Sequence, residues 1–172
     1  YISVTGVQTC ALPIFAFHRD GLLARSGKSN GTLLQKWLSH SYFKSAPPKS
    51  LDRNHFHDIS SDLGSLSDSD GVATLLDFTV KSIARARDHL PHKPHRWLIC
   101  GGGRHNHFLM ERLQNELRIP VKPVEALGWN GDMLEAECFG WLAVRAVKGL
   151  AVSLPTTTGV PQPMTGGRID YP

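Results

Sequence analysis

Trp97-Leu98-Ile99-Cys100-Gly101-Gly102-Gly103-Arg104-His105-Asn106 joins a short apolar run to three consecutive glycines. An amphipathic segment, Asn106 to Leu117, follows at once, so the stretch predicts a buried parallel strand over Arg96 to Cys100, a tight turn and a helix. Glycine passes through positive φ without strain and lets another molecule approach the backbone, so the turn offers bare N–H groups at a helix start. Such a turn suits a nucleotide phosphate or ribose, although glycine-rich turns also serve as plain structural corners.

A second glycine-punctuated loop occupies residues 128–137, Gly-Trp-Asn-Gly-Asp-Met-Leu-Glu-Ala-Glu, and leads into another predicted helix. Asp132 has the residue type of an N-cap, and Glu135 stands three positions later, as in a capping box. The acidic pair therefore has a structural explanation beside any role in binding a ligand.

The remaining pattern predicts an α/β fold. The expected elements are a helix from Gly31 to Tyr42, a loop from Asp52 to Asp70, a helix from Asp70 to His89 capped by Ser69 or Asp70, a strand from Ile119 to Val124, a helix from Asp132 to Lys148 and a surface tail after Gly149. The last helix sets Ala136, Gly140 and Ala143 along one face, which favours close packing against a neighbour. The order indicates helices packed on a small sheet with too few strands to be complete.

The composition is that of one ordinary globular domain. The chain has 172 residues, 41% hydrophobic and 20% charged, with a net charge of +4. No basic cluster is interleaved with aromatic residues and no apolar run has the length of a membrane span, so neither nucleic acid nor a membrane is an expected partner. Cys10, Cys100 and Cys138 are odd in number and lack metal-type spacing, and the last two fall in segments expected to be buried. We therefore expect a reduced, cytoplasmic protein.

Two further patterns carry no expected site. The histidines gather in two groups, His55 with His57, and His89 with His92 and His95. No carboxylate or thiolate completes a ligand set, so no metal site is expected. Ser26-Gly27-Lys28-Ser29 imitates the end of a phosphate-binding P-loop, but Leu22 stands where that loop needs its first glycine.

The N-terminal segment differs from the rest of the chain. Residues 4–14, Val-Thr-Gly-Val-Gln-Thr-Cys-Ala-Leu-Pro-Ile, are similar to the in-frame translation of an adapter oligonucleotide used in short-read sequencing libraries. The segment lacks the basic leading region of a signal peptide, and Pro13 breaks its short apolar stretch. We assign residues 1–14 to a non-native adapter-derived segment and expect residues 15–172 to be the C-terminal part of a longer protein.

From about Phe15 onward, several different short motifs follow one another along the chain. They are Arg19-Asp20-Gly21 with Ala24-Arg25-Ser26-Gly27, Tyr42-Phe43 with residues 47–54 (Pro-Pro-Lys-Ser-Leu-Asp-Arg-Asn), Cys100-Gly101-Gly102-Gly103 with Asn106, residues 128–132 (Gly-Trp-Asn-Gly-Asp) with Glu135-Ala136, and Leu154-Pro155 with Thr158-Gly159-Val160. In this order they resemble the C-terminal part of the anhydro-N-acetylmuramic acid kinase family. The glycine motif is shared with actin-like, hexokinase-like and Hsp70-like kinases, whereas the Pro-Pro-Lys-Ser and Asn-Gly-Asp combinations are narrower.

The resemblance implies an incomplete C-terminal lobe of an actin-like (RNase H-like) ATPase fold. It implies an ATP-dependent phosphotransferase of peptidoglycan recycling and amino sugar catabolism, with ATP and Mg²⁺ as cofactors. Family members open the 1,6-anhydro ring of anhydro-N-acetylmuramic acid with water and phosphorylate the 6-oxygen, which yields N-acetylmuramic acid 6-phosphate. Two lobes close on ATP and the amino sugar, and the full-length protein is expected to be a homodimer.

The resemblance also implies site residues. The nucleotide-binding corner corresponds to Gly101, Gly102, Gly103 and Asn106, and the acidic positions on the sugar side correspond to Asp132 and Glu135. Lys49 and Arg53 have two open explanations, contact with an anionic group such as the lactyl carboxylate, or ordinary surface charge.

The family's catalytic aspartate belongs to an Asp-Thr-Gly-Pro-Gly-Asn motif upstream of the first matched segment. Neither that motif nor the family's N-terminal glycine-rich phosphate loop occurs in this chain, so no catalytic residue is assigned and the chain is expected to be inactive alone. The alternative hypothesis is a self-contained α/β nucleotide-binding or interaction module without catalysis. A reading frame that continues upstream through the aspartate motif would separate the two.

Overall fold

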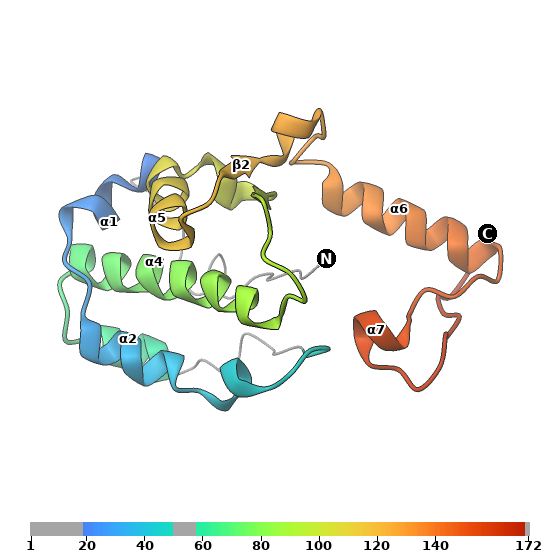
Figure 1. The fold of residues 1–172 in the computed structure, drawn as a ribbon, viewed down its shortest axis with the longest axis horizontal. Helices are drawn as coiled ribbons and strands as arrows, with labels where there is room; N and C mark the ends of the chain where they lie inside the picture. The colour runs from blue at the N-terminus through green and yellow to red at the C-terminus, as the bar shows by residue number, and fades with distance from the viewer. Residues whose placement is uncertain (1–18, 50–57, 171–172) are drawn as a thin grey trace.

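The structure is a computed structural model that describes residues 19–49 and 58–170. In this part the chain forms a helix-rich α/β fold with a small parallel sheet (Figure 1). The helices are α1 (Leu22–Ser26), α2 (Gly31–Leu38), α3 (Asp58–Leu63), α4 (Asp68–Ala84), α5 (His107–Leu117), α6 (Leu134–Val147) and α7 (Pro155–Thr158), and the strands are β1 (Trp97–Ile99) and β2 (Val121–Pro123). Short 3₁₀ turns occupy Arg19–Gly21, Ser41–Lys44, Arg85–His89, Gly102–His105 and Val124–Leu127.

The strand, turn and helix predicted from the glycine-rich stretch are confirmed as β1, the turn and α5. β1 pairs in parallel with β2, with Trp97 opposite Val121. Gln114 of α5 ties the helix to the second strand, because its side chain accepts a hydrogen bond from the Val121 amide at 2.9 Å and donates one to the Ile119 carbonyl at 2.9 Å. β1 is half-buried rather than fully buried, and Cys100, expected in the interior, is exposed.

α4 is the long helix that the apolar periodicity predicted, and its start is two residues earlier than expected. Ser67, not Ser69 or Asp70, is the N-cap, and its hydroxyl accepts a hydrogen bond from the Asp70 amide at 3.2 Å. Asp68 and Asp70 then lie in the first turn, where negative charge is favourable to the helix dipole. The α-helix ends at Ala84, and the remaining predicted residues form a 3₁₀ turn.

α4 separates two apolar clusters. The α5 cluster comprises Ala24, Leu76, Val80, Ala84, Leu113, Leu117 and Val121. The α2 cluster comprises Leu34, Trp37, Leu38, Ile59 and Phe78. Phe78 is 1% exposed and meets Trp37 and Phe43 edge to face, with ring centroids 5.6 and 5.9 Å apart. Figure 1 shows the same arrangement, with α4 running between α2 on one side and α5 on the other.

The predicted helix from Gly31 to Tyr42 is too long. Asn30 caps α2 by accepting hydrogen bonds from the Thr32 and Leu33 amides at 3.1 Å, but the helix ends at Leu38. His40 adopts an extended backbone, and its ring nitrogen accepts a hydrogen bond from the Tyr42 amide, which starts a separate 3₁₀ turn.

The predicted loop from Asp52 to Asp70 is wrong in part, because α3 lies within it. Ile59 is 6% exposed in the α2 cluster, and Leu63 packs against that cluster. The Asp62 carboxylate accepts hydrogen bonds from Lys36 Nζ at 2.7 Å and Trp37 Nε1 at 2.8 Å. Tertiary contacts therefore stabilise a segment whose Ser and Asp content favours a loop.

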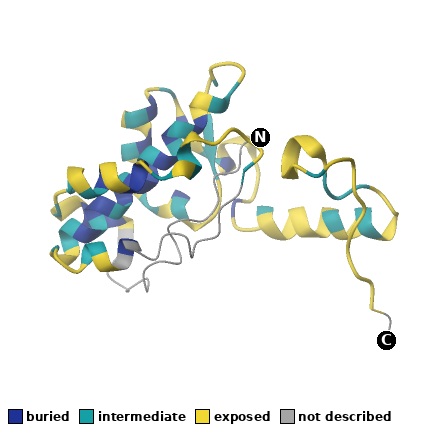
Figure 2. Cartoon of the chain, turned by 90° about the horizontal axis from the view of Figure 1, so that it is seen from below, coloured by how far each residue is buried: buried dark blue, intermediate teal, exposed yellow. Residues whose placement is uncertain are grey.

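α6 projects away from the rest of the structure and is mostly exposed (Figures 1 and 2). None of its residues is buried, so the expected close packing of Ala136, Gly140 and Ala143 is not found among the described residues. Its exposed apolar side chains include Phe139, Trp141, Val144 and Val147, and Cys138, expected to be buried, is exposed as well. Within the described part of the chain, no helix has the length and apolar character needed to cross a membrane.

Some predictions fall outside the described residues. These are the adapter-derived segment at residues 1–14 and its boundary at residue 15, Cys10, Arg53, His55 and His57.

We expect Leu113→Ala to lower the free energy of unfolding by about 3 kcal/mol, because truncation of a fully buried leucine leaves a cavity in the α5 cluster. Urea unfolding followed by circular dichroism measures the change. The matched control, Leu22→Ala, truncates a leucine that is 61% exposed and should change the value by less than about 0.5 kcal/mol. Equal losses in the two variants would show that α5 does not pack as described.

Candidate functional site

The three glycines after β1 differ in how strongly the fold requires glycine at each position. Gly101 has φ 73°, a conformation that other residues adopt only with strain. A Cβ at Gly103 would lie 3.4 Å from Leu109 Cδ2, an ordinary contact. Gly102 has no positive φ and is exposed, and a Cβ added there would meet nothing within 4 Å. Nothing in the described fold requires glycine at Gly102, which leaves its backbone open to an approaching molecule.

Asn106 has a structural role beside the turn. Its side-chain oxygen accepts a hydrogen bond from the Leu109 amide at 3.0 Å and so caps α5. Gly21 lies against this side chain, because a Cβ on Gly21 would come 2.5 Å from Asn106 Oδ1. Asn106 therefore fixes the start of α5 and the end of the glycine turn against the segment that precedes α1.

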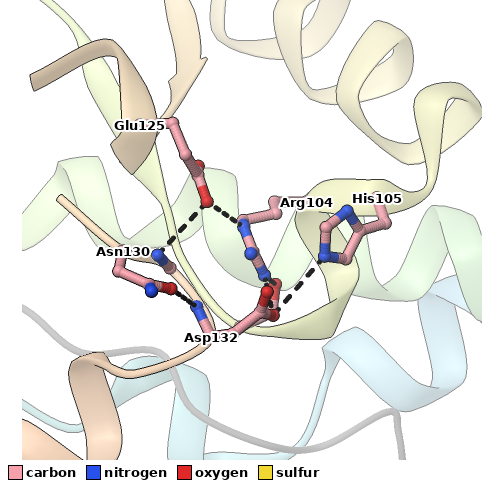
Figure 3. Close-up of polar contacts among 7 residues, drawn as sticks. Arg104, His105, Glu125, Asn130 and Asp132 are labelled. Carbon is pink, nitrogen blue, oxygen red and sulfur yellow. Dashed lines mark hydrogen bonds and ion pairs between the residues drawn. The ribbon is translucent and has the colours of Figure 1, made fainter. Parts of the chain in front are cut away.

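Arg104 is the residue that sequence reasoning missed. Its side chain is 3% exposed, although it carries a charge. Nε donates to Glu125 Oε1 at 2.8 Å, and Nη1 donates to Asp132 Oδ1 at 2.8 Å and to the Gly101 carbonyl at 2.9 Å (Figure 3). A buried guanidinium is tolerated only when it is paired and hydrogen-bonded, and here both conditions are met.

Asp132 does not cap α6, so the predicted N-cap and capping box are wrong. The N-cap position is Met133, which has no side-chain hydrogen bond to the helix. The Asp132 carboxylate turns instead to Arg104, and His105 Nε2 lies 3.5 Å from the same oxygen. Asn130 Oδ1 accepts a hydrogen bond from the Asp132 amide at 3.1 Å, which shapes the loop. The hydrogen bond from Arg104 is the main cause that lowers the pKa of Asp132 to about 2.

Glu125, in the 3₁₀ turn after β2, is the second acidic partner of Arg104. Its Oε1 also accepts a hydrogen bond from the Gly131 amide at 3.2 Å. A hydrogen bond from its own backbone amide, and then those from Arg104 and Gly131, lower the pKa of Glu125. Gly131 is buried, and a Cβ there would overlap the Arg104 guanidinium and lie 2.8 Å from Glu125 Oε1. Glycine at 131 is therefore required by packing.

An open hollow of about 540 Å³ lies beside this cluster. It is lined by Asp20, Arg104, His105, His107, Pro123 and Glu125. His107 Nδ1 and Asp20 Oδ1 are 3.1 Å apart at its border. The lining is mostly polar or charged and can admit a polar ligand. Gly102 and Asp132 are exposed beside the cluster, but they are not among the residues that line the hollow.

Not every expected site residue joins the cluster. Arg104 joins Gly101 of the glycine turn to Asp132, whereas Glu135 lies exposed in the first turn of α6. None of the glycines of the turn, Asp132 or Glu135 is among the residues that line the hollow. The described residues contain no group of three or more His, Cys, Asp or Glu side chains that could hold a metal ion.

Lys49 is held by its own chain. Its Nζ donates to the carbonyls of Tyr42 and Ser45, each at 2.8 Å, and lies 3.2 Å from His89 Nε2. Partial burial lowers the pKa of Lys49. These contacts give Lys49 a structural role in the segment after α2.

We expect Asp132→Asn to reduce the acid sensitivity of the fold. A carboxyl whose pKa is about 2 in the folded chain, against an ordinary 3.8, contributes stability above about pH 4 that is lost as the pH falls toward 2. The destabilisation caused by Asp132→Asn should therefore be larger at pH 6 than at pH 2.5 in urea unfolding. The carboxyls of Glu125, Asp62 and Asp70 titrate in both proteins, so their effect cancels in the difference between parent and variant. A loss of stability that is the same at both pH values would therefore contradict the ion pair between Asp132 and Arg104.

Comparison with known proteins gives one consistent family. The family model described as anhydro-N-acetylmuramic acid kinase matches residues 11–172. The chain is 53% identical over 152 residues to the anhydro-N-acetylmuramic acid kinase of Rhodospirillum rubrum, covering 88% of this chain and 40% of the relative. The kinases of that name from Acidiphilium cryptum and Roseobacter denitrificans are 49% and 48% identical, over 91% of this chain and 44% and 42% of each relative.

The chain thus spans only about two fifths of the length of these curated relatives. The family match nevertheless includes all of the described residues, from the segment before α1 to the tail after α7. The glycine turn and the Asp132 loop both fall inside it. This chain belongs to the anhydro-N-acetylmuramic acid kinase family.

Proposed function

We propose that this chain is part of an ATP-dependent kinase that converts 1,6-anhydro-N-acetylmuramic acid and water to N-acetylmuramic acid 6-phosphate. Family membership supports the reaction, and the open backbone at Gly102 is the structural observation that carries it. In this proposal the chain contributes a partial C-terminal lobe of an actin-like fold, and residues 15–172 form that lobe. The described helix-rich α/β fold with its small parallel sheet is consistent with such a lobe.

The glycine turn is the proposed nucleotide side of the site. Gly102 and Gly103 begin a 3₁₀ turn, so their amides have no acceptor within that turn and can donate to phosphate or ribose oxygens. The absence of a side chain at Gly102 lets a nucleotide reach the backbone. Asn106 supports the corner by holding the start of α5. ATP would supply the transferred phosphoryl group when bound.

The Asp132 loop is the proposed sugar side of the site. Asp132 is ionised and its side chain is 67% exposed, so it can accept hydrogen bonds from sugar hydroxyls. Glu135 follows one helical turn later and is exposed, so it is available to the same ligand. Since the described residues include no metal cluster, Mg²⁺ would come with the nucleotide phosphates and no step attributed to this chain depends on it.

The reaction needs a general base, which in this proposal lies outside this sequence. Water adds to the anomeric carbon while the bond from that carbon to O6 breaks, O6 takes the γ-phosphoryl group of ATP, and ADP leaves. A carboxylate must accept the proton of the attacking water. The Asp-Thr-Gly-Pro-Gly-Asn motif is absent from the chain, so we assign the base to the part of the relatives that the chain does not span. We propose a cytoplasmic enzyme that is a homodimer at full length.

A chimaera tests this function. The 152 matched residues of the Rhodospirillum rubrum kinase are replaced by those of this chain, and formation of the sugar phosphate is followed by mass spectrometry. We expect ATP-dependent product, with one ¹⁸O atom at the anomeric carbon when the reaction runs in H₂¹⁸O. The isolated 172-residue chain should form none. A folded chimaera without activity would reject the kinase assignment and favour a nucleotide-binding or interaction module.

We expect Gly102→Ala in this chimaera to raise the KM for ATP by about tenfold, because a methyl group would enter the space through which the nucleotide approaches the backbone. Melting temperature should stay unchanged, since nothing lies within 4 Å of that methyl group. Gly140→Ala on α6 is the matched control, because its Cβ is equally uncrowded but lies on a helix remote in sequence from the turn. An unaltered KM in Gly102→Ala would place the nucleotide elsewhere.

A further inference from the structure

Arg104 is buried at the meeting point of three segments. Its hydrogen bonds reach the carbonyl of Gly101 in the glycine turn, Glu125 in the turn after β2, and Asp132 in the loop before α6. These acceptors are distant in sequence but each lies within 2.9 Å of one guanidinium. The planar fork of an arginine can satisfy several acceptors in fixed directions, which the single ammonium centre of lysine cannot.

Backbone groups also hydrogen-bond among the segments that Arg104 contacts. The Gly101 amide donates to the Gly131 carbonyl at 3.3 Å, and the Gly131 amide donates to Glu125 Oε1 at 3.2 Å. Gly131 has no room for a side chain because the Arg104 guanidinium lies directly against it. The segments around the guanidinium are therefore packed together, with a separation set by Arg104.

The carboxylate of Asp132 is held by one edge. Arg104 and His105 both contact Oδ1, while the Asp132 side chain remains 67% exposed. A ligand can therefore reach the Asp132 carboxylate, whose orientation is fixed by Arg104 and His105. Arg104 borders the hollow, but its side chain is only 3% exposed and offers little surface to such a molecule.

We propose that Arg104 is a positioning residue that locks the glycine turn to the Asp132 loop and so fixes the spacing between the nucleotide and the sugar. The inference rests on the proposed function, in which these two segments bind the two substrates. Arg104 acts through Gly101 and Asp132 rather than by touching either substrate. Its removal should therefore affect both substrates at once, whereas loss of a simple binding contact would affect one.

Steady-state kinetics of the chimaera test the proposal. We expect Arg104→Gln to raise the KM for ATP and the KM for the sugar together, and to lower kcat/KM by about a hundredfold, because displaced groups lose alignment. Arg104→Lys keeps the charge but not the fork, so its loss should be intermediate. KM values for both substrates within twofold of the parent would overturn the proposal.

Arg112→Gln is the control that distinguishes a positioning role of Arg104 from a general contribution to stability. Arg112 of α5 pairs with Asp77 of α4, so this control also removes an ion pair of the fold, but one outside the three segments. We expect it to lower the melting temperature and leave both KM values unchanged. If Arg104→Gln does not fold, Gly131→Ala decides, since it displaces the guanidinium without removing its charge. Unchanged kinetics in a folded Gly131→Ala variant would overturn the proposal.

A failure of the proposed function would be recognised separately. If the parent chimaera is inactive, the kinase assignment fails, and amide hydrogen exchange of the 172-residue chain then tests the lock itself. We expect Arg104→Lys to speed exchange at the Gly101 and Gly131 amides by about tenfold, because the two segments separate more often. Exchange at the rate of the unaltered chain would overturn the inference independently of any activity.

Discussion

Helix α4 buries side chains on two opposite faces, and the placement of the other elements depends on this. Residues two apart on a helix differ by about 200° in direction, so Phe78 points to the α2 cluster while Leu76 and Val80 point to the α5 cluster. α1, α2 and α5 all contact this one helix. Because α5 also carries Gln114 to β2 and Asn106 to the glycine turn, the position of the site follows from the packing of α4.

The candidate site pairs a buried positive charge with two partly exposed negative charges. One guanidinium faces two carboxylates, and the Asp132 and Glu125 side chains are 67% and 45% exposed while Arg104 is 3% exposed. The positive charge is therefore internal and the negative charges lie at the surface. The hydrogen bond from Arg104 lowers the pKa of Asp132, so its carboxylate stays ionised to a lower pH. The Asp132 carboxylate accepts a hydrogen bond from Arg104 and does not cap α6.

Sequence alone predicted the local features whose signal is local. The glycines after an apolar run, the periodicity of α4 and the strand predicted from Ile119 to Val124 each depend on residues close together in the chain. All three were found, the last as the shorter β2 (Val121–Pro123). Arg104 could not be singled out, because its burial depends on Glu125 and Asp132, 21 and 28 residues away. α3 was missed for the same reason, since Trp37 and Lys36 stabilise it from another helix. The only available signal for Arg104 was a basic residue inside the glycine motif with two acidic loops downstream.

α6 starts one residue after Met133, so the helix and the Asp132 loop form one mechanical unit. Fourteen helical residues extend about 21 Å, and a sideways shift of 2 Å at the far end would tilt the helix by about 5°. The exposed apolar side chains along α6 are available for contact with another surface. The loop at the start of α6 is the one that Arg104 joins to Gly101 of the glycine turn through Asp132. The Asp132 loop thus continues directly into a helix on which no residue is buried and which carries exposed Phe139, Trp141, Val144 and Val147.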